Sequence, residues 1–140
     1  MGIFNLFRSQ DKVDKELFVA SMLGDYNHVK RYIKKEANVN VLYHHENRKL
    51  KLSPLIVAVI SNHIDIVSLL LENGADINLS DNTKRCPLHY AAIYGHIELV
   101  NLLLENGADP LKTDSSNLTP EQLAKKYSHL EIASILKVKA

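Results

Sequence analysis

The sequence has no tryptophan and only one cysteine, Cys86, among its 140 residues. A single cysteine excludes an intramolecular disulfide, so a reducing compartment is the simpler expectation. Its five glycines are scattered, which excludes a glycine-rich phosphate-binding loop. It also contains neither a CxxC pair nor a GxSxG motif around a nucleophilic serine. These absences remove common signatures of redox, nucleotide-binding and hydrolytic enzymes.

An excess of charge is missing too. The 17 basic and 16 acidic residues leave a net charge of +1, whereas a generic nucleic-acid-binding domain is usually more basic. No apolar run approaches the roughly 20 residues that a membrane-spanning helix needs. The run at residues 3–7 is interrupted by Asn5 and is too short for the core of a secretory signal. We therefore expect a cytoplasmic protein without a membrane span, with a secreted effector destination left open.

Two interpretations of the N-terminus stay open. The apolar side chains of Ile3, Phe4, Leu6 and Phe7 either fold back over the first helices or form a small hydrophobic docking tag. After them, Asp14 is the expected N-cap of the first regular helix, because its carboxylate suits the free N–H groups of a helix start.

What the sequence does contain is an internal repeat. Residues 86–109 read CPLHYAAIYGHIELVNLLLENGAD, and residues 53–76 read SPLIVAVISNHIDIVSLLLENGAD. The landmarks that recur every 33 residues are Pro54, Pro87 and Pro120; His63, His96 and His129; and the pairs Asn73–Gly74 and Asn106–Gly107. The proline begins one helix in each of these three units, and the Asn-Gly pair ends a second helix in the first two of them. Since one unit alone is too small to be stable, the units must stack.

A 33-residue period with this content resembles the ankyrin repeat. The resemblance implies an all-α repeat solenoid of helix-turn-helix units joined by hairpin fingers, with about four repeats including degenerate caps. The repeats would occupy about residues 14–40, 53–85, 86–118 and 119–140, in a single domain at 14–140 after an N-terminal extension at 1–13. The step from Leu17 to Leu55 is 38 residues, so five extra residues fall in an extended finger at 41–52.

Two residue patterns resemble a catalytic pair and a metal site, but a structural role explains each of them better. Cys86 and His89 lie one helical turn apart, as a nucleophile and its base would. They occupy the slot that ankyrin repeats fill with Thr-Pro-Leu-His, so the resemblance implies a structural role for both. The repeated histidines stand about one helix diameter apart, too far to share a metal ion whose ligands lie about 2 Å away. We expect no enzyme activity, catalytic residue, metal site or cofactor.

Ankyrin stacks usually bind through their fingertips and the inner face of their first helices. The resemblance therefore implies a monomer that binds a partner protein in a concave groove, as an inhibitor, adaptor, immunity or effector protein. The candidate partner-binding residues are those free of the packing pattern: Tyr43, His44, Arg48, Lys49, Ile60, Arg85, Ile93, Tyr94, Lys126 and Tyr127. Aromatic and apolar groups with cations at their edge match the composition of protein-recognition hot spots.

The long finger supports a second hypothesis. Residues 43–51 read YHHENRKLK, a basic and aromatic segment in which the alternation around Lys51 also predicts a short strand. This segment is a candidate site for an acidic ligand or a nucleic acid, although the small net charge makes nucleic acid the less expected partner. Binding to phosphates weakens steeply with salt, so salt dependence separates the two hypotheses.

Overall fold

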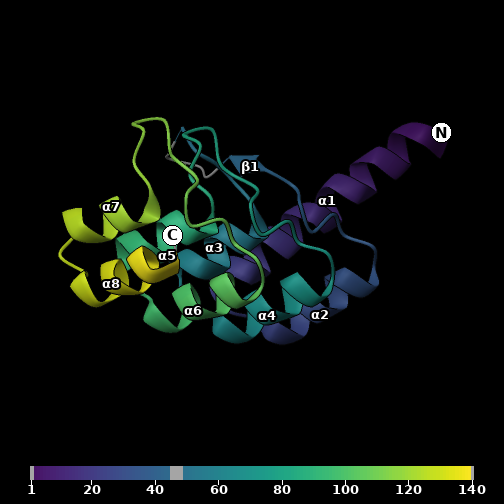
Figure 1. The fold of residues 1–140 in the computed structure, drawn as a ribbon. Coiled ribbons are helices and arrows are strands. Elements are labelled where there is room, and N and C mark those ends of the chain that lie inside the picture. The colour runs from purple at the N-terminus through teal and green to yellow at the C-terminus, as the bar shows by residue number, and fades with distance from the viewer. Residues whose placement is uncertain (1, 45–48, 140) are drawn as a thin grey trace.

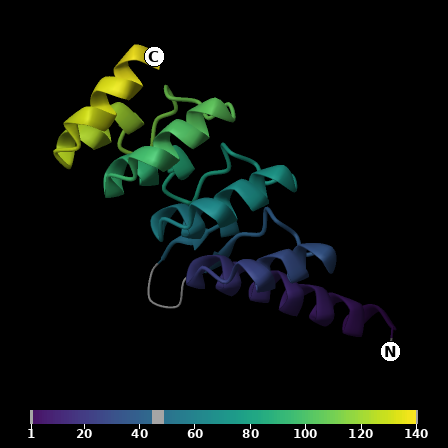
Figure 2. The same ribbon diagram turned by 90° about the horizontal axis from the view of Figure 1, so that it is seen from below.

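The computed structural model describes residues 2–44 and 49–139, with side chains between residues 9 and 137 of those ranges. Its helices form four successive pairs. The first helices are α1 (Gly2–Leu23), α3 (Pro54–Ile60), α5 (Pro87–Tyr94) and α7 (Pro120–Lys126), and the second helices are α2 (Tyr26–Lys34), α4 (Ile64–Glu72), α6 (Ile97–Glu105) and α8 (Leu130–Lys139). Figure 1 shows α2, α4 and α6 in a layer below α1, α3 and α5, and Figure 2 shows the pairs following one another from end to end. The predicted all-α repeat solenoid is confirmed.

Local sequence determines where the first helices begin. The Oγ of Ser53 accepts a hydrogen bond from the N–H of Ile56 at 3.1 Å, and the Oγ1 of Thr119 accepts one from the N–H of Gln122 at 3.3 Å. Gln122 returns a bond, because its Oε1 accepts the N–H of Thr119 at 2.9 Å. A proline follows each cap at the first helical position, where no N–H is needed.

The first helices form the continuous core of the stack. α1 packs on α3, α3 on α5 and α5 on α7. Leucines recur at one buried position, and alanines at another: Leu17, Leu55 and Leu88, and Ala20, Ala58, Ala91 and Ala124. The small alanine side chains let neighbouring helices approach closely, while the leucines fill the space between them. Hydrophobic burial therefore continues from repeat to repeat, as the stacking argument requires.

A histidine ties each later repeat to the repeat before it. The Nε2 atoms of His63, His96 and His129 lie 3.2, 3.1 and 3.0 Å from the carbonyl oxygens of Met22, Ile60 and Ile93, respectively. These carbonyls are in the last turn of a first helix, where the helix itself supplies no donor. Each ring N–H therefore satisfies an acceptor that would otherwise need water, and it does so across the interface between two repeats.

The connecting segments project together as fingers (Figure 1). In the first finger, β1 (Tyr43–His44) pairs antiparallel with β2 (Lys51–Leu52), so a strand is present around Lys51 as predicted. Asn82 joins the second finger to the first: its Oδ1 accepts the N–H of Lys51 at 2.9 Å, and its Nδ2 donates to the carbonyl of Lys49 at 2.7 Å. The third finger joins the second through the N–H of Ser115, which donates to the carbonyl of Thr83 at 2.9 Å.

The N-terminal segment differs from expectation. Residues 2–13 form the first half of α1, which extends beyond the stack in Figure 1, so their backbone does not fold back over the first helices. Asp14 is not an N-cap: it lies within α1 and is only 8% exposed. Its Oδ1 instead accepts the backbone N–H of Asn38 at 2.7 Å and the side-chain amide of Gln10 at 2.8 Å. The side chains of residues 3–7 lie outside the described part of the structure, so the docking tag and the domain boundary at residue 14 stay predictions.

The close contact between Gly95 and the ring of His129 predicts that alanine destabilises the protein more at Gly95 than at Gly107. A Cβ on Gly95 (φ +74°) would lie 2.6 Å from Cε1 of His129, whereas one on Gly107 (φ +89°) would have nothing within 4 Å. Each alanine would adopt a left-handed conformation, at a cost of about 1–2 kcal/mol. Gly95→Ala would also displace the ring, and such overpacking costs about 1–3 kcal/mol more.

Urea unfolding of Gly95→Ala and Gly107→Ala should therefore show that the first loses clearly more free energy of unfolding. Equal losses in the two variants would contradict the described contact between Gly95 and His129.

Candidate protein-binding surface

A strip of equivalent residue pairs runs along the C-terminal ends of the first helices. We call it the rim strip, and it consists of Met22–Leu23, Ile60–Ser61, Ile93–Tyr94 and Lys126–Tyr127. The first member of each pair is half-buried in the first three repeats, and the second member is exposed. Leu23, Tyr94 and Tyr127 have exposed fractions of 69%, 44% and 46%, so the strip places several large apolar or aromatic side chains at the surface. The structure thus leaves the predicted Tyr94 and Tyr127 accessible, beside half-buried Ile60 and Ile93.

The backbone under the rim strip is held in place. The carbonyl groups of Met22, Ile60 and Ile93 are the acceptors for the stacking histidines. The ring of Tyr94 also stacks on that of His96, with centroids 6.0 Å apart and planes inclined by 16°. Because this backbone is already held in place, it does not have to be ordered when the strip binds a partner.

Tyr43 is placed differently from the other candidate residues. Its ring lies 5.7 Å from that of Phe18, and its hydroxyl lies 2.6 Å from Oδ1 and 2.7 Å from the carbonyl oxygen of Asp11. Burial, reinforced by the bond to Asp11, raises the pKa of Tyr43. Tyr43 therefore anchors the first finger to α1, and a role for it in partner binding stays a prediction.

Arg85 is also engaged within the protein. Its Nε donates to Oδ2 of Asp114 at 3.2 Å, between two fingers. The Oδ1 of Asp114 accepts the N–H groups of Ser116 at 2.9 Å and Leu118 at 3.0 Å. Burial raises the pKa of Asp114, but these N–H groups and the Arg85 guanidinium outweigh it and leave the pKa lowered. The guanidinium of Arg85, only 29% exposed, thus stabilises the finger stack, and its contact with a partner stays a prediction.

The preceding finger has a similar internal carboxylate. The Oδ1 of Asp81 accepts the N–H of Thr83 at 2.7 Å and that of Arg85 at 3.1 Å. Its Oδ2 accepts the hydroxyl of buried Tyr90. Burial, together with the nearby carboxylate, raises the pKa of Tyr90. The acidic residues of both finger turns are therefore buried in the fold.

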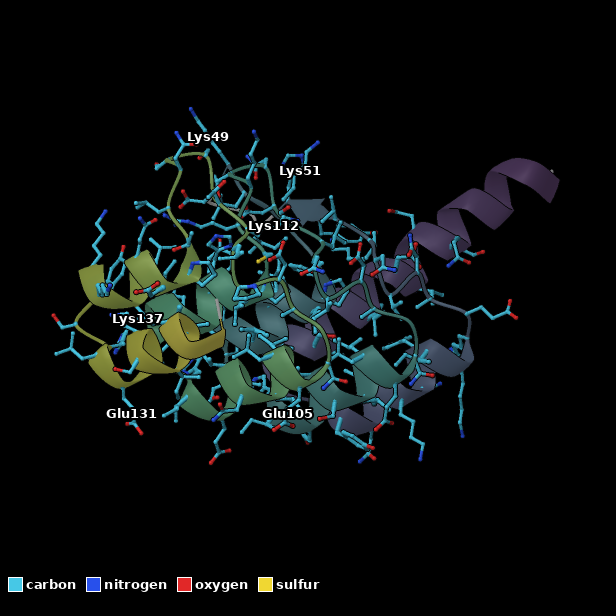
Figure 3. All side chains as sticks on the ribbon, in the orientation of Figure 1. Lys49, Lys51, Glu105, Lys112, Glu131 and Lys137 are labelled. Atoms are coloured by element: carbon cyan, nitrogen blue, oxygen red, sulfur yellow. The ribbon has the colours of Figure 1, made fainter. Side chains whose placement is uncertain are left out.

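Lysines dominate the exposed charge of the fingers. Lys49, Lys51 and Lys84, which we call the fingertip lysines, are exposed, and none of them forms an ion pair with a described residue. Figure 3 shows Lys49 and Lys51 at the outer end of the fingers, with His44 exposed in the same hairpin. The predicted Arg48 lies outside the described residues. Lys84 is not among the candidate residues predicted from the sequence. The 33-residue spacing between Asp81 and Asp114 was a signal that these two acids are structural.

The Cys86–His89 pair is buried, and its thiol lacks the lowered pKa of a catalytic cysteine. The Nδ1 of His89 accepts the N–H of Cys86 at 3.1 Å and lies 3.0 Å from its sulfur, while Nε2 lies 3.2 Å from the carbonyl oxygen of Leu118. Burial raises the pKa of the Cys86 thiol and lowers that of His89. A catalytic cysteine needs a lowered pKa instead. The geometry gives His89 a structural role: it caps its own helix and bonds the next finger.

The described residues contain neither a cluster of metal ligands nor a membrane-spanning helix. No three histidine, cysteine, aspartate or glutamate side chains among them come together as ligands for one metal ion. None of the described helices combines the length and the apolar character that crossing a membrane requires.

Comparisons with known proteins agree with the architecture. A family model described as ankyrin repeats, in three copies, matches residues 17–114. A stretch of 66 residues is 36% identical to alpha-latrocrustotoxin-Lt1a of Latrodectus tredecimguttatus. That alignment covers 46% of this chain but only 4% of the toxin, so the likeness concerns a small part of the larger protein.

Buried His89 predicts a loss of stability at mildly acidic pH. Its pKa is lowered from the ordinary 6.5, so the unfolded chain binds the proton more readily than the folded protein. The contribution of neutral His89 to stability is therefore complete above pH 6.5 and is lost as the pH falls towards the lowered value. His89→Gln keeps an acceptor for the N–H of Cys86, as Gln122 does for Thr119, and removes the titrating group.

Urea unfolding at several pH values between 7.5 and 5 should show a smaller acid-dependent loss in His89→Gln than in the wild type. The other histidines are shared by both proteins and cancel in the comparison. Parallel pH dependences would contradict this account of His89.

Proposed function

The chain belongs to the ankyrin-repeat family, and we propose that it is a non-catalytic protein-binding module that contacts its partner along the rim strip and the fingertips. Ankyrin repeats generally serve as protein-interaction modules. The proposal includes monomeric action in the cytoplasm, in keeping with one buried, unpaired cysteine. Inhibitors, adaptors, immunity proteins and effectors would all use such a surface.

The proposal rests on the exposure of Tyr94 and Tyr127. The two residues occupy equivalent positions in adjacent repeats and are 44% and 46% exposed. Stacking of the repeats uses the backbone at this edge of the helices, through the carbonyls of Ile60 and Ile93, and leaves the tyrosine side chains outside. Tyrosine offers a large contact area at a small cost in conformational entropy, and it is enriched in binding hot spots.

The shape beside the rim strip favours a macromolecular partner. The cleft between the third and fourth repeats, lined by Gly95, His129 and Leu130 among others, has a volume of about 330 Å³ and is open to solvent. Small-molecule sites instead bury most of their ligand in an apolar cavity. A protein surface that spans several repeats would cover the strip more completely than a small ligand would.

The similarity to alpha-latrocrustotoxin-Lt1a supports the repeat scaffold only. Since the alignment covers 4% of that toxin, we do not extend a toxin activity to this chain.

A second candidate function uses the basic finger at residues 43–51, which would bind an acidic ligand or a nucleic acid. Lys49 and Lys51, which are exposed and form no ion pair with a described residue, favour it. This candidate predicts a steep loss of affinity with salt, whereas contact through the rim strip predicts a modest one.

The proposal predicts that Tyr94→Ala combined with Tyr127→Ala weakens binding without unfolding the protein. The partner is first captured from source cells with tagged wild-type protein, and dissociation constants are then measured with purified components. We expect at least about a tenfold loss of affinity, since truncating a hot-spot residue costs about 1–2 kcal/mol or more. The free energy of unfolding should change by about 0.5 kcal/mol or less per exposed site.

Leu111→Ala is the matched control, because Leu111 is a large apolar residue with 60% exposure outside the rim strip. Unchanged affinity in the double tyrosine variant would contradict the proposed surface, as would an equal loss in Leu111→Ala.

A further inference from the structure

We propose that the rim strip and the fingertip lysines together select an acidic protein segment, in which large apolar side chains are interspersed with aspartate or glutamate. This inference rests on the proposed function and adds the chemical class of the partner. It follows from how the structure distributes its nearly balanced charges between buried and exposed positions.

The acidic residues of the finger turns do not contribute to the exposed surface. Asp81 and Asp114 are 6% and 3% exposed. Asp81 accepts hydrogen bonds from Thr83 and Tyr90, and Asp114 is paired with Arg85. Two negative charges and one positive charge of the fingers are thus used internally. The exposed charges on the described outer turns of the fingers are the three fingertip lysines, while exposed Asp76 and Asp109 lie at the base of the second and third fingers, four residues after the ends of α4 and α6.

The C-terminal end of the rim strip also carries positive charge, as the fingertips do. The Nζ of Lys125 pairs with Oε1 of Glu121 at 2.6 Å, which uses the acidic residue of α7. Lys126 is exposed beside Tyr127 and has no ion-pair partner among the described residues. At the opposite end of the strip, half-buried Glu16 and exposed Asp25 are the acidic side chains near Leu23. Along the rim strip itself, an acidic ligand therefore finds its basic partner, Lys126, in the last repeat.

The second-helix layer is acidic in α4 and α6, which contain no basic residue, whereas α8 carries exposed Lys137 as well as Glu131. Its exposed acidic residues are Asp65, Glu72, Glu98, Glu105 and Glu131, on α4, α6 and α8. In Figure 3, Glu105 and Glu131 lie at the lower edge of the molecule, away from Lys49 and Lys51. α2, in the first repeat, is instead basic, with Lys30, Arg31 and Lys34 exposed. Over the second and third repeats this separation attracts an acidic partner to the finger side and repels it from the other.

Because the rim strip is largely apolar, a protein fits this surface better than a nucleic acid does. A few spaced lysines on a chain of net charge +1 are a weak electrostatic site for a duplex, which binds proteins largely through its phosphates. The apolar surface of Ile93, Tyr94 and Tyr127 is instead matched by leucine or aromatic side chains. A segment that combines such residues with carboxylates satisfies both parts of the surface at once.

The test is selection from a phage-displayed library of random 16-residue peptides, with purified full-length protein as the target. Selected sequences should be enriched in aspartate, glutamate and large apolar residues. The best peptide, synthesised and measured by fluorescence anisotropy, should bind Lys84→Glu/Lys126→Glu about 5–10-fold more weakly than wild type, since each exposed charge pair contributes about 0.2–1 kcal/mol and reversal adds repulsion. The difference should shrink at high salt.

The matched control is Lys30→Glu/Lys34→Glu, which makes the same change in net charge on α2. Affinity within about twofold of wild type is expected there, because exposed charges more than about 10 Å away are screened. An equal loss in this control would mean that net charge alone governs binding, and would overturn the inference.

The remaining outcomes separate this inference from the proposed function. Peptides that need Tyr94 and Tyr127 but show no excess of acidic residues would overturn the inference and leave the proposed function standing. Peptides indifferent to Tyr94→Ala/Tyr127→Ala, or the absence of any enriched peptide, would overturn both. Tighter binding of single-stranded (dT)20 than of the best peptide, with competition between them, would overturn the inference in favour of nucleic acid.

Discussion

The hydrogen bond from a histidine ring to the preceding repeat is the interaction on which the rest of the structure depends. It occurs with His63, His96 and His129, always to a carbonyl in the last turn of a first helix. Each histidine follows a residue with positive φ, which turns the chain sharply from the first helix into the second: Asn62, Gly95 and Ser128. Asp25 replaces the histidine in the first repeat, where it caps α2 instead. The stack is thus fixed by a polar bond at its edge as well as by apolar burial at its centre.

This bond also connects the scaffold with the proposed binding surface. Its acceptors are the carbonyls of Met22, Ile60 and Ile93, which are themselves members of the rim strip. Stacking therefore uses the backbone of these residues and leaves neighbouring side chains, such as Tyr94, free to vary. A solenoid that repeats one structural bond can in this way present a different contact residue in each repeat, on a backbone that does not have to reorganise when it binds.

Most of the fold could be predicted from the sequence, because its signals are local and repeated. Proline after a capping residue, apolar spacing and Asn-Gly pairs determine the helix pairs, and the exposure of Tyr94 and Tyr127 follows from their place outside the packing pattern. The engagement of Tyr43 with Asp11, and of Arg85 with Asp114, could not be predicted, since these partners lie 32 and 29 residues apart and meet only after the fingers have stacked. The prediction that Asp14 is an N-cap was wrong for a related reason. Asp14 is a residue type that often caps helices, but it lies within a longer helix and accepts a hydrogen bond from a distant loop instead.

The central claim is that the edge which joins the repeats also contacts the partner, and amide chemical-shift mapping by NMR tests it most directly. The ¹⁵N-labelled protein would be titrated with its captured partner or with a peptide selected for binding. The account predicts that the largest shifts fall on residues 93–94 and 126–127 and on the turn around Lys84, with the exposed faces of α4 and α6 unchanged. Shifts concentrated on α4 and α6, with the rim strip unaffected, would contradict it.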